Sequence, residues 1–147
     1  MIKIIQNRSG CPISSSLEII GDTWSLLIIR DLFLQHTRFS DFMNSPEKIS
    51  SNILTNRLKK LLNFNLIEFY RKPNDKKVKK YFLTSAGINL YPLIYNMSTW
   101  SKEYLDIEYN NIALDWYKTN SDKTPSQTIL DDIKTYENFK KSELKYV

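Results

Sequence analysis

The chain has little cysteine, histidine and glycine. Its 147 residues include one cysteine, one histidine, three glycines and five prolines. Cys11 cannot form a disulfide within the chain, and Cys11 and His36 are too few to build a Cys/His metal cage, so we expect no metal site. Because glycine and proline dominate turns, their scarcity favours a mainly helical fold.

Long hydrophobic runs are also missing. A membrane-spanning helix needs roughly 18 or more apolar residues, and the longest compact apolar patch here is residues 26–29. Residues 1–6 lack a long apolar stretch followed by a small-residue cleavage site, so no secretory signal is predicted. We expect a cytoplasmic protein that has no membrane partner.

Motifs of catalysis are absent as well. The sequence contains no Gly-rich phosphate loop and no nucleophile elbow, and His36 has no obvious catalytic partner. The acid pair at residues 131–132 falls on an expected solvated helix face. We therefore predict a protein that is not an enzyme and needs no cofactor. The length fits a single domain with its own core.

Positive charge is concentrated in the middle third of the chain. The net charge is +5, but residues 30–80 hold 12 Lys/Arg and 5 Asp/Glu, a local surplus of +7. The stretches on either side are neutral or slightly acidic. This pattern is typical of a nucleic-acid contact, or of an ordinary solvated face on a lysine-rich protein.

Periodic apolar residues predict three helices before residue 45. The first begins at Pro12 and stops at Gly21, although Ser15 and Glu18 have capping-box spacing and allow a later start. The second is capped by Asp22 and runs to about residue 35. After a turn or short strand at residues 36–39, Ser40 is expected to cap a short third helix.

A strongly periodic helix and a hairpin follow. Ser50 is the expected N-cap, and the leucines of residues 54–62 form the inner face. Asn65 tolerates the left-handed backbone conformation that often follows the last turn of a helix, so the helix is expected to end near it. Residues 66–72 and 78–83 read as two strands joined by the basic loop 73–77.

The last part of the chain reads as helices. Thr84 is expected to cap a long helix to about Glu108, with a kink at Pro92. Residues 110–123 are mixed, and Thr124 with Pro125 opens a final amphipathic helix whose inward residues are expected to be these: Ile129, Leu130, Ile133, Tyr136 and Phe139.

The order of elements predicts a mainly α fold with a small β-hairpin wing (α+β). A short helix, a turn, a longer helix with a polar outer face and a basic hairpin make a winged helix-turn-helix. We expect residues 1–107 to form the DNA-binding domain, including the first helix and the long later helix. Residues 108–147 are expected to be a helical extension of the same unit.

The chemistry of this arrangement suits double-stranded DNA. Asn can bond bidentately to adenine in the major groove, and lysines on a wing can neutralise phosphates. The ordinary alternatives are a solvated helix surface for Asn52, Thr55 and Asn56, and an aggregation-blocking edge for the wing lysines at 72, 76, 77, 79 and 80. The candidate DNA-binding residues are Arg38, Ser50, Ser51, Asn52, Thr55, Asn56, Lys59, Lys72, Lys76 and Lys77.

The sequence resembles the HxlR-type winged helix-turn-helix transcriptional regulators, relatives of the MarR group, over about residues 11–105. The matching positions, in family order, are Cys11-Pro12, Ile20-Gly21-Asp22, Trp24, residues 26–32, 38–42, Ile49-Ser50, Leu54-Thr55, Arg57-Leu58, Leu61, Leu66-Ile67, Pro73, Tyr81, Leu83-Thr84 and Gly87. Lys48 and Asn65 stand where the family usually has glycine, Thr23 where it often has a basic residue, and Phe69 where it often has arginine. The lysine-rich wing also departs from the family's proline-containing form.

The resemblance implies a homodimer on a pseudo-palindromic operator, held together by its terminal helices. The broad apolar surface of residues 88–104 is consistent with a dimer contact, and also with coverage by the final helix, residues 125–141. A protein-interaction or RNA-binding winged-helix module is the competing hypothesis.

Some HxlR-type regulators respond to oxidants or electrophiles through a cysteine placed like Cys11. At the positive end of a helix dipole, with Lys3 and Arg8 nearby in sequence, the anionic sulfur is favoured. The alternative is an inert structural residue at a dimer interface. An unidentified aromatic or lipophilic effector could also bind near Trp24, Phe42, Tyr95 or Trp100, although such aromatics are more often core.

Overall fold

The computed structural model describes residues 1–3 and 8–145. Residues 4–6, part of the segment in which no signal sequence was found, lie outside the described residues. The helices and strands are α1 Pro12–Ile20, α2 Ser25–Phe33, α3 Phe39–Met43, α4 Ser51–Asn63, β1 Ile67–Lys72, β2 Asp75–Leu83, α5 Ser85–Ile88, α6 Tyr91–Tyr104, α7 Asn111–Thr119 and α8 Pro125–Leu144. The predicted fold class, mainly α with a two-stranded hairpin wing, is confirmed.

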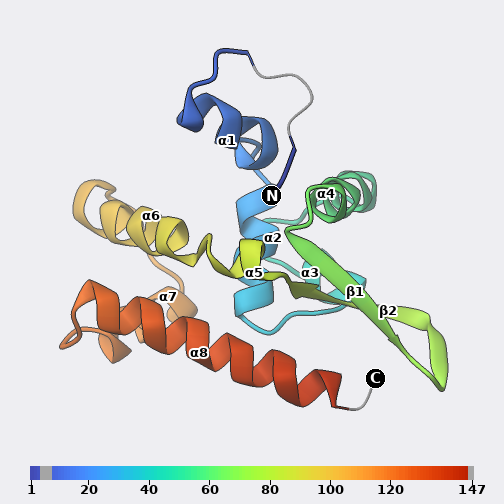
Figure 1. Cartoon of the computed structure of the whole chain (residues 1–147). Coiled ribbons are helices and arrows are strands. Elements are labelled where there is room, and N and C mark those ends of the chain that lie inside the picture. The colour runs from blue at the N-terminus through green and yellow to red at the C-terminus, as the bar shows by residue number, and fades with distance from the viewer. Residues whose placement is uncertain (4–7, 146–147) are drawn as a thin grey trace.

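The elements surround one apolar core near α2 (Figure 1). Ile29 and Leu32 of α2 and Leu54 of α4 have no exposed surface. The inner face of the hairpin joins them through Ile67 and Leu83, which pair directly in the antiparallel register. The core therefore fixes α2, α4 and the base of the hairpin relative to one another.

The base of the hairpin is covered on both faces. Successive strand residues point to opposite sides, and Phe69 with Tyr81 faces the core, where their ring centroids are 6.2 Å apart. On the other side α8 packs along the hairpin (Figure 1): the ring centroids of Phe82 and Phe139 lie 6.4 Å apart, and the hydroxyl of Tyr136 accepts a 2.7 Å bond from the Leu83 amide. The final helix therefore supports the base of the wing.

Several helix starts occur where the sequence predicts them. α1 begins at Pro12, not at the later start that Ser15 and Glu18 allowed. The caps at Ser50, Thr84 and Thr124 are confirmed, because each hydroxyl accepts a backbone N–H of the first helical turn. The left-handed conformation of Asn65 is confirmed, with φ of +52°.

Other boundaries differ from the prediction. Ser40 lies inside α3 and does not cap it; instead the Asp41 carboxylate accepts the amides of Thr37 and Arg38. The long helix expected over residues 84–108 is two helices, because the chain turns at residues 89–90 before Pro92. It ends at Tyr104.

Three further corrections concern the hairpin turn, the extent of α2 and the inner face of α8. The turn is only residues 73–74, since the Asp75 carboxylate accepts amides of the following residues and β2 begins there. α2 spans only Ser25–Phe33 and its N-cap is Trp24, not Asp22, although the Asp22 carboxylate accepts the Ser25 amide. Leu130, expected to point inward, is 66% exposed.

Candidate nucleic-acid interface

The position of α4 is set by its apolar face. Leu54, Leu58 and Leu61 are buried, and Ser50 Oγ accepts the Ile53 amide at 3.3 Å at the start of the helix. Because residues three and four apart share a helix face, the opposite side of α4 faces solvent. The Ser50 side-chain oxygen accepts a hydrogen bond within the helix start and so serves as the N-cap of α4.

The outer face of α4 carries the amide and lysine side chains that the sequence singled out. Asn52, Thr55, Asn56 and Lys59 are all exposed. The Thr55 hydroxyl donates a 2.8 Å bond to the Ser51 carbonyl oxygen. The side chains of Asn52, Asn56 and Lys59 make no hydrogen bond or ion pair with any residue that the structure describes. These three side chains are available to an external partner.

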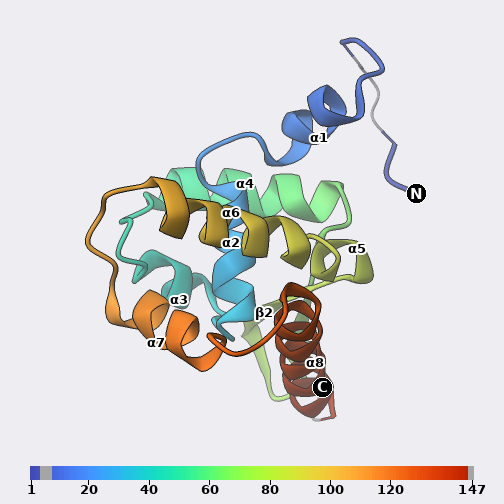
Figure 2. The same cartoon turned by 90° about the vertical axis from the view of Figure 1, so that its left-hand side faces the viewer.

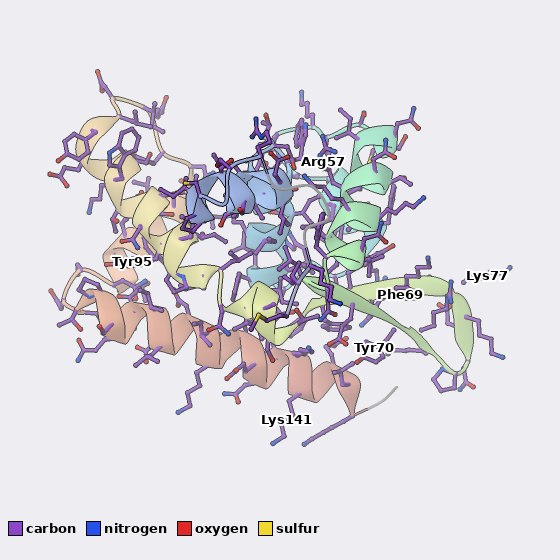
Figure 3. The ribbon with its side chains drawn as sticks, turned by 45° about the horizontal axis from the view of Figure 1, so that its top comes forward. Arg57, Phe69, Tyr70, Lys77, Tyr95 and Lys141 are labelled. Carbon is purple, nitrogen blue, oxygen red and sulfur yellow. The ribbon has the colours of Figure 1, made fainter. Side chains whose placement is uncertain are left out.

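The other two cations of α4 have an internal partner that sequence analysis missed. Arg57 Nε lies 2.9 Å from Asp22 Oδ1, and Lys60 Nζ lies 3.2 Å from Asp22 Oδ2. Arg57 points from α4 toward the start of α2 (Figure 3). No local pattern connects residues 35 positions apart, so the sequence carried no signal for this contact.

Asp22 ties the start of α2 to α4. Besides the two cations, its carboxylate accepts the amides of Trp24 at 3.0 Å and Ser25 at 2.9 Å, and the Ser25 hydroxyl at 2.6 Å. Burial alone would raise the pKa of Asp22, but these hydrogen bonds and Lys60 hold the pKa well below its ordinary value. The carboxylate therefore stays charged and fixes the angle of α4.

The lysines of the hairpin fall into two groups, those around the turn and those nearer the base. Lys72, Lys76 and Lys77 are exposed around the turn, and Lys77 lies at the far end of the wing (Figure 3). Within residues 8–145 none of these three has a carboxylate partner. Their ammonium groups are free to contact phosphate.

The two lysines nearer the base of the wing are engaged. Lys79 Nζ lies 4.5 Å from the centroid of the Phe69 ring, and Arg71 stacks over the same ring at 5.1 Å. Lys80 pairs with Glu143 of α8. The aromatic residue at position 69, where the family often has arginine, thus has a structural explanation: it is the platform for two cations.

Arg38 lies apart from the wing tip. It precedes α3, its amide is held by Asp41 at 2.8 Å, and its backbone bridges to Lys80 at the base of the hairpin. Its side chain is exposed. The structure brings the outer face of α4 and the hairpin to one side of the molecule, the right-hand side of Figure 1, opposite α6 and α7.

Cys11 is on a separate element from these residues. It is exposed at the N-cap of α1, and its amide lies 3.4 Å from Ser9 Oγ. Arg8, one of the two cations near Cys11 in sequence, pairs with Glu18 at 2.5 Å. The burial expected of an inert cysteine is not seen in the single chain.

The described residues contain no group of three or more His, Cys, Asp or Glu side chains placed to hold a metal ion. Along the same residues, every helix is too short or too polar to cross a lipid bilayer.

Comparisons with known proteins agree with this geometry. The model of the HxlR-like helix-turn-helix family matches residues 19–109. The HTH-type transcriptional regulator YdeP of Bacillus subtilis is 33% identical over 99 residues, which cover 66% of this chain and 76% of that protein.

Solved structures give the same result. PA1607, a proposed transcription factor, is 31% identical, with a TM-score of 0.63 over 71% of this chain and 72% of that one. The reduced form of the transcriptional regulator YodB from B. subtilis is 30% identical, with a TM-score of 0.55 over 65% of this chain and 95% of that one. YdeP and YodB are both transcriptional regulators by name. The chain belongs to the HxlR-like helix-turn-helix family and is a transcriptional regulator of that type.

Proposed function

We propose that this regulator acts in the cytoplasm as a homodimer that binds double-stranded DNA sequence-specifically, with α4 in the major groove and the hairpin over the phosphate backbone. The observation that carries the proposal is the outer face of α4. It presents Asn52, Asn56 and Lys59 without an internal partner among the described residues and without an acidic neighbour. Asn side chains suit adenine, and a helix fits the major groove.

The remaining candidate residues have supporting roles in this proposal. Ser50, Ser51 and Thr55 lie at the start and on the outer face of α4, where hydroxyls reach bases or phosphates. Arg38, Lys72, Lys76 and Lys77 supply charge that carries no sequence information.

Exposed apolar side chains on α1 and α6 support the homodimer. Leu17 is 54% exposed, Met97 51% and Trp100 56%. α8 covers Tyr91 at the start of α6, where the Tyr91 hydroxyl bonds to Asp132, but it leaves the later turns open. Coverage by the final helix therefore accounts for the start of α6, and the exposed later turns are the surface that we propose for the dimer contact. A two-fold dimer would place the centres of its two half-sites one helical turn of DNA apart, or a multiple of that distance. One turn is about 34 to 36 Å.

We further propose that residues 108–147 belong to the same structural unit as the winged domain. Lys140 of α8 supports this, because its ammonium lies 2.6 Å from Glu68 of β1 and 2.6 Å from the Leu83 carbonyl oxygen.

The test is a titration of the purified chain against the DNA upstream of its own gene, with excess nonspecific competitor, at several salt concentrations. We expect strong preference for one duplex and a steep fall of affinity with salt. Weak and unselective binding to every duplex tried would contradict the proposal and favour the protein-interaction or RNA-binding module.

We also propose that Cys11 makes the regulator responsive to thiol oxidants. Its exposure supports this proposal. YodB has been solved in reduced, diamide-treated and quinone-bound forms, and HypR, 25% identical over 66% of this chain, is a redox regulator solved in its oxidised form. Since Cys11 is the sole cysteine, its oxidation would form either a disulfide between two chains or a mixed disulfide with a small thiol.

Diamide provides the test of Cys11. Two Cys11 thiols, one from each chain, lose two protons and two electrons to the azo bond, which becomes a hydrazine, and the sulfurs form a disulfide. We expect diamide treatment to change the DNA affinity of the native protein and to leave the DNA affinity of Cys11→Ser unchanged. Equal responses of the two proteins, or none in either, would contradict a sensor role.

A further inference from the structure

A cavity of about 570 Å³ lies between the winged core and the carboxyl-terminal helices. α2 and the loop after α3 form one wall, and α6, α7 and α8 form the other. In Figure 1 α7 lies between α6 above and α8 below, and in Figure 2 it is on the side toward the viewer. The family match ends at residue 109, so α7 and α8 add a wall to this cavity from outside the matched region.

The lining is mainly apolar and aromatic. Phe33, Tyr91, Ile94, Trp116 and Tyr117 contribute most of its large side chains. The size lies within the usual range for sites that bind small molecules, roughly 300 to 1,000 Å³.

The aromatic wall is held in place by hydrogen bonds. Trp116 Nε1 donates to Asp132 Oδ2 at 2.9 Å, and the Tyr91 hydroxyl donates to the same oxygen. The Tyr117 hydroxyl donates to the Ser98 carbonyl oxygen at 2.8 Å. Tyr95, labelled in Figure 3, packs edge-on against Trp116, with ring centroids 5.8 Å apart. The rings therefore keep their positions when the cavity is empty.

The charges that face the cavity are mostly negative. Arg30 contributes a cation, but its guanidinium is already bound by Asp31 at 2.7 Å and by Glu47 at 2.7 Å. Asp41 and Asp132 also line the cavity, and neither forms an ion pair with a described residue. The other titratable groups of the lining are His36, which is near Asp31, and the phenols of Tyr91 and Tyr117. An anionic ligand would meet uncompensated carboxylates.

We propose that this cavity binds a small lipophilic aromatic cation. Its rings would lie against Trp116, and its charge would be balanced by the Asp132 carboxylate, which is fixed by Tyr91 and Trp116. Aromatic faces attract cations, and a carboxylate at the edge of an apolar cavity adds a charge preference.

The test is isothermal titration calorimetry of the full chain, without DNA, with tetraphenylphosphonium. Tetraphenylborate is the matched control, because it has nearly the same shape and the opposite charge. We expect one phosphonium per chain and binding of the borate at least tenfold weaker. Absence of phosphonium binding, or equal binding of the two ions as expected of a merely greasy surface, would overturn the proposal.

Asp132→Asn tests the carboxylate. The amide oxygen still accepts from Trp116 and Tyr91, so only the charge is removed, and we expect phosphonium affinity to fall about tenfold. Asp115→Asn is the matched control, since Asp115 is exposed on α7 and does not line the cavity. Equal affinities of the two variants would contradict the role of Asp132.

A second variant covers the case in which Asp132→Asn does not fold. Ile112 lines the cavity and is 59% exposed, so a larger side chain there is tolerated at its rim. We expect Ile112→Trp to obstruct the entrance and to reduce phosphonium binding at least fivefold while the unfolding temperature stays unchanged. Unchanged binding by this folded variant would place the phosphonium elsewhere and overturn the proposal.

Discussion

The two sides of α4 differ in what their polar side chains contact. On the inner side Arg57 and Lys60 are paired with Asp22, and on the outer side Asn52, Asn56 and Lys59 have no partner among the described residues. The hairpin repeats the contrast, because Lys80 is paired with Glu143 near the base while Lys76 and Lys77 are free near the turn. The positive surplus of residues 30–80 therefore has two uses. Part of it holds the fold together, and the rest is open to DNA.

The largest expected effect concerns the apolar inner face. Leu58 is buried against the core, so Leu58→Ala should lower the free energy of unfolding by about 2–5 kcal/mol through lost burial and a residual cavity. Its neighbour Lys59 is exposed, and Lys59→Ala should leave stability within about 0.5 kcal/mol. Urea unfolding of both variants checks this contrast. A stable Leu58→Ala protein would contradict the assignment of the inner face.

The next effect concerns base recognition. Asn52→Ala or Asn56→Ala should cost about 1–3 kcal/mol of binding free energy at the preferred duplex and relax the base preference, because an amide that reads a base edge is lost. Fluorescence anisotropy with the preferred duplex and its single-base variants measures both quantities. Uniform weakening across all duplexes would mean that these residues contact phosphate instead.

A smaller effect is expected at Asp22. Asp22→Asn keeps an acceptor for the amides of Trp24 and Ser25 but removes the charge facing Arg57 and Lys60, so unfolding free energy should fall by about 1 kcal/mol at neutral pH. The pKa of Asp22 is held below its ordinary value of 3.8. Its contribution is therefore present above that value and is lost progressively as the pH falls below it.

Acid unfolding tests the prediction for Asp22. The stability gap between the native sequence and Asp22→Asn should narrow as the pH falls below about 4. Asp106→Asn, at an exposed position, should show no gap at any pH. A gap that persists unchanged to low pH would indicate loss of capping and not of charge.

The smallest effect concerns the wing. Lys76→Ala or Lys77→Ala should weaken binding to every duplex alike and reduce the slope of log affinity against log salt by about 1, because one phosphate contact is lost. Lys80→Ala should leave the slope unchanged, since its charge is committed to Glu143. Equal slopes for Lys77→Ala and Lys80→Ala would show that pairing within the chain does not separate the two groups.

Features set by neighbouring residues could be predicted from the sequence. The caps at Ser50 and Thr84 and the left-handed Asn65 depend on bonds within a few residues, and each is seen. The predicted cap at Ser40 was wrong, and the reason is also local. Asp41, one residue later, is the stronger acceptor, and its carboxylate accepts the amides of Thr37 and Arg38.

Features set by distant residues could not be predicted. The division of cations depends on Asp22 and Glu143, which lie far from their partners in sequence. The cavity depends on α7 docking through Trp116 onto Asp132, a contact that no periodicity reveals. None of the aromatics near which the sequence suggested an effector, Trp24, Phe42, Tyr95 or Trp100, lines the 570 Å³ cavity, and an effector at those residues stays a prediction.

Two of the left-handed residues, Lys48 and Asn65, lie just outside the two ends of α4, with φ of +56° and +52°. Each is followed at once by a buried side chain, Ile49 and Leu66, so both corners are anchored to the core. The helix is therefore fixed at its ends and along its inner face, and its outer face contributes little to folding. If the proposed DNA contact is right, substitutions on that outer face would change the preferred duplex while the fold keeps its stability.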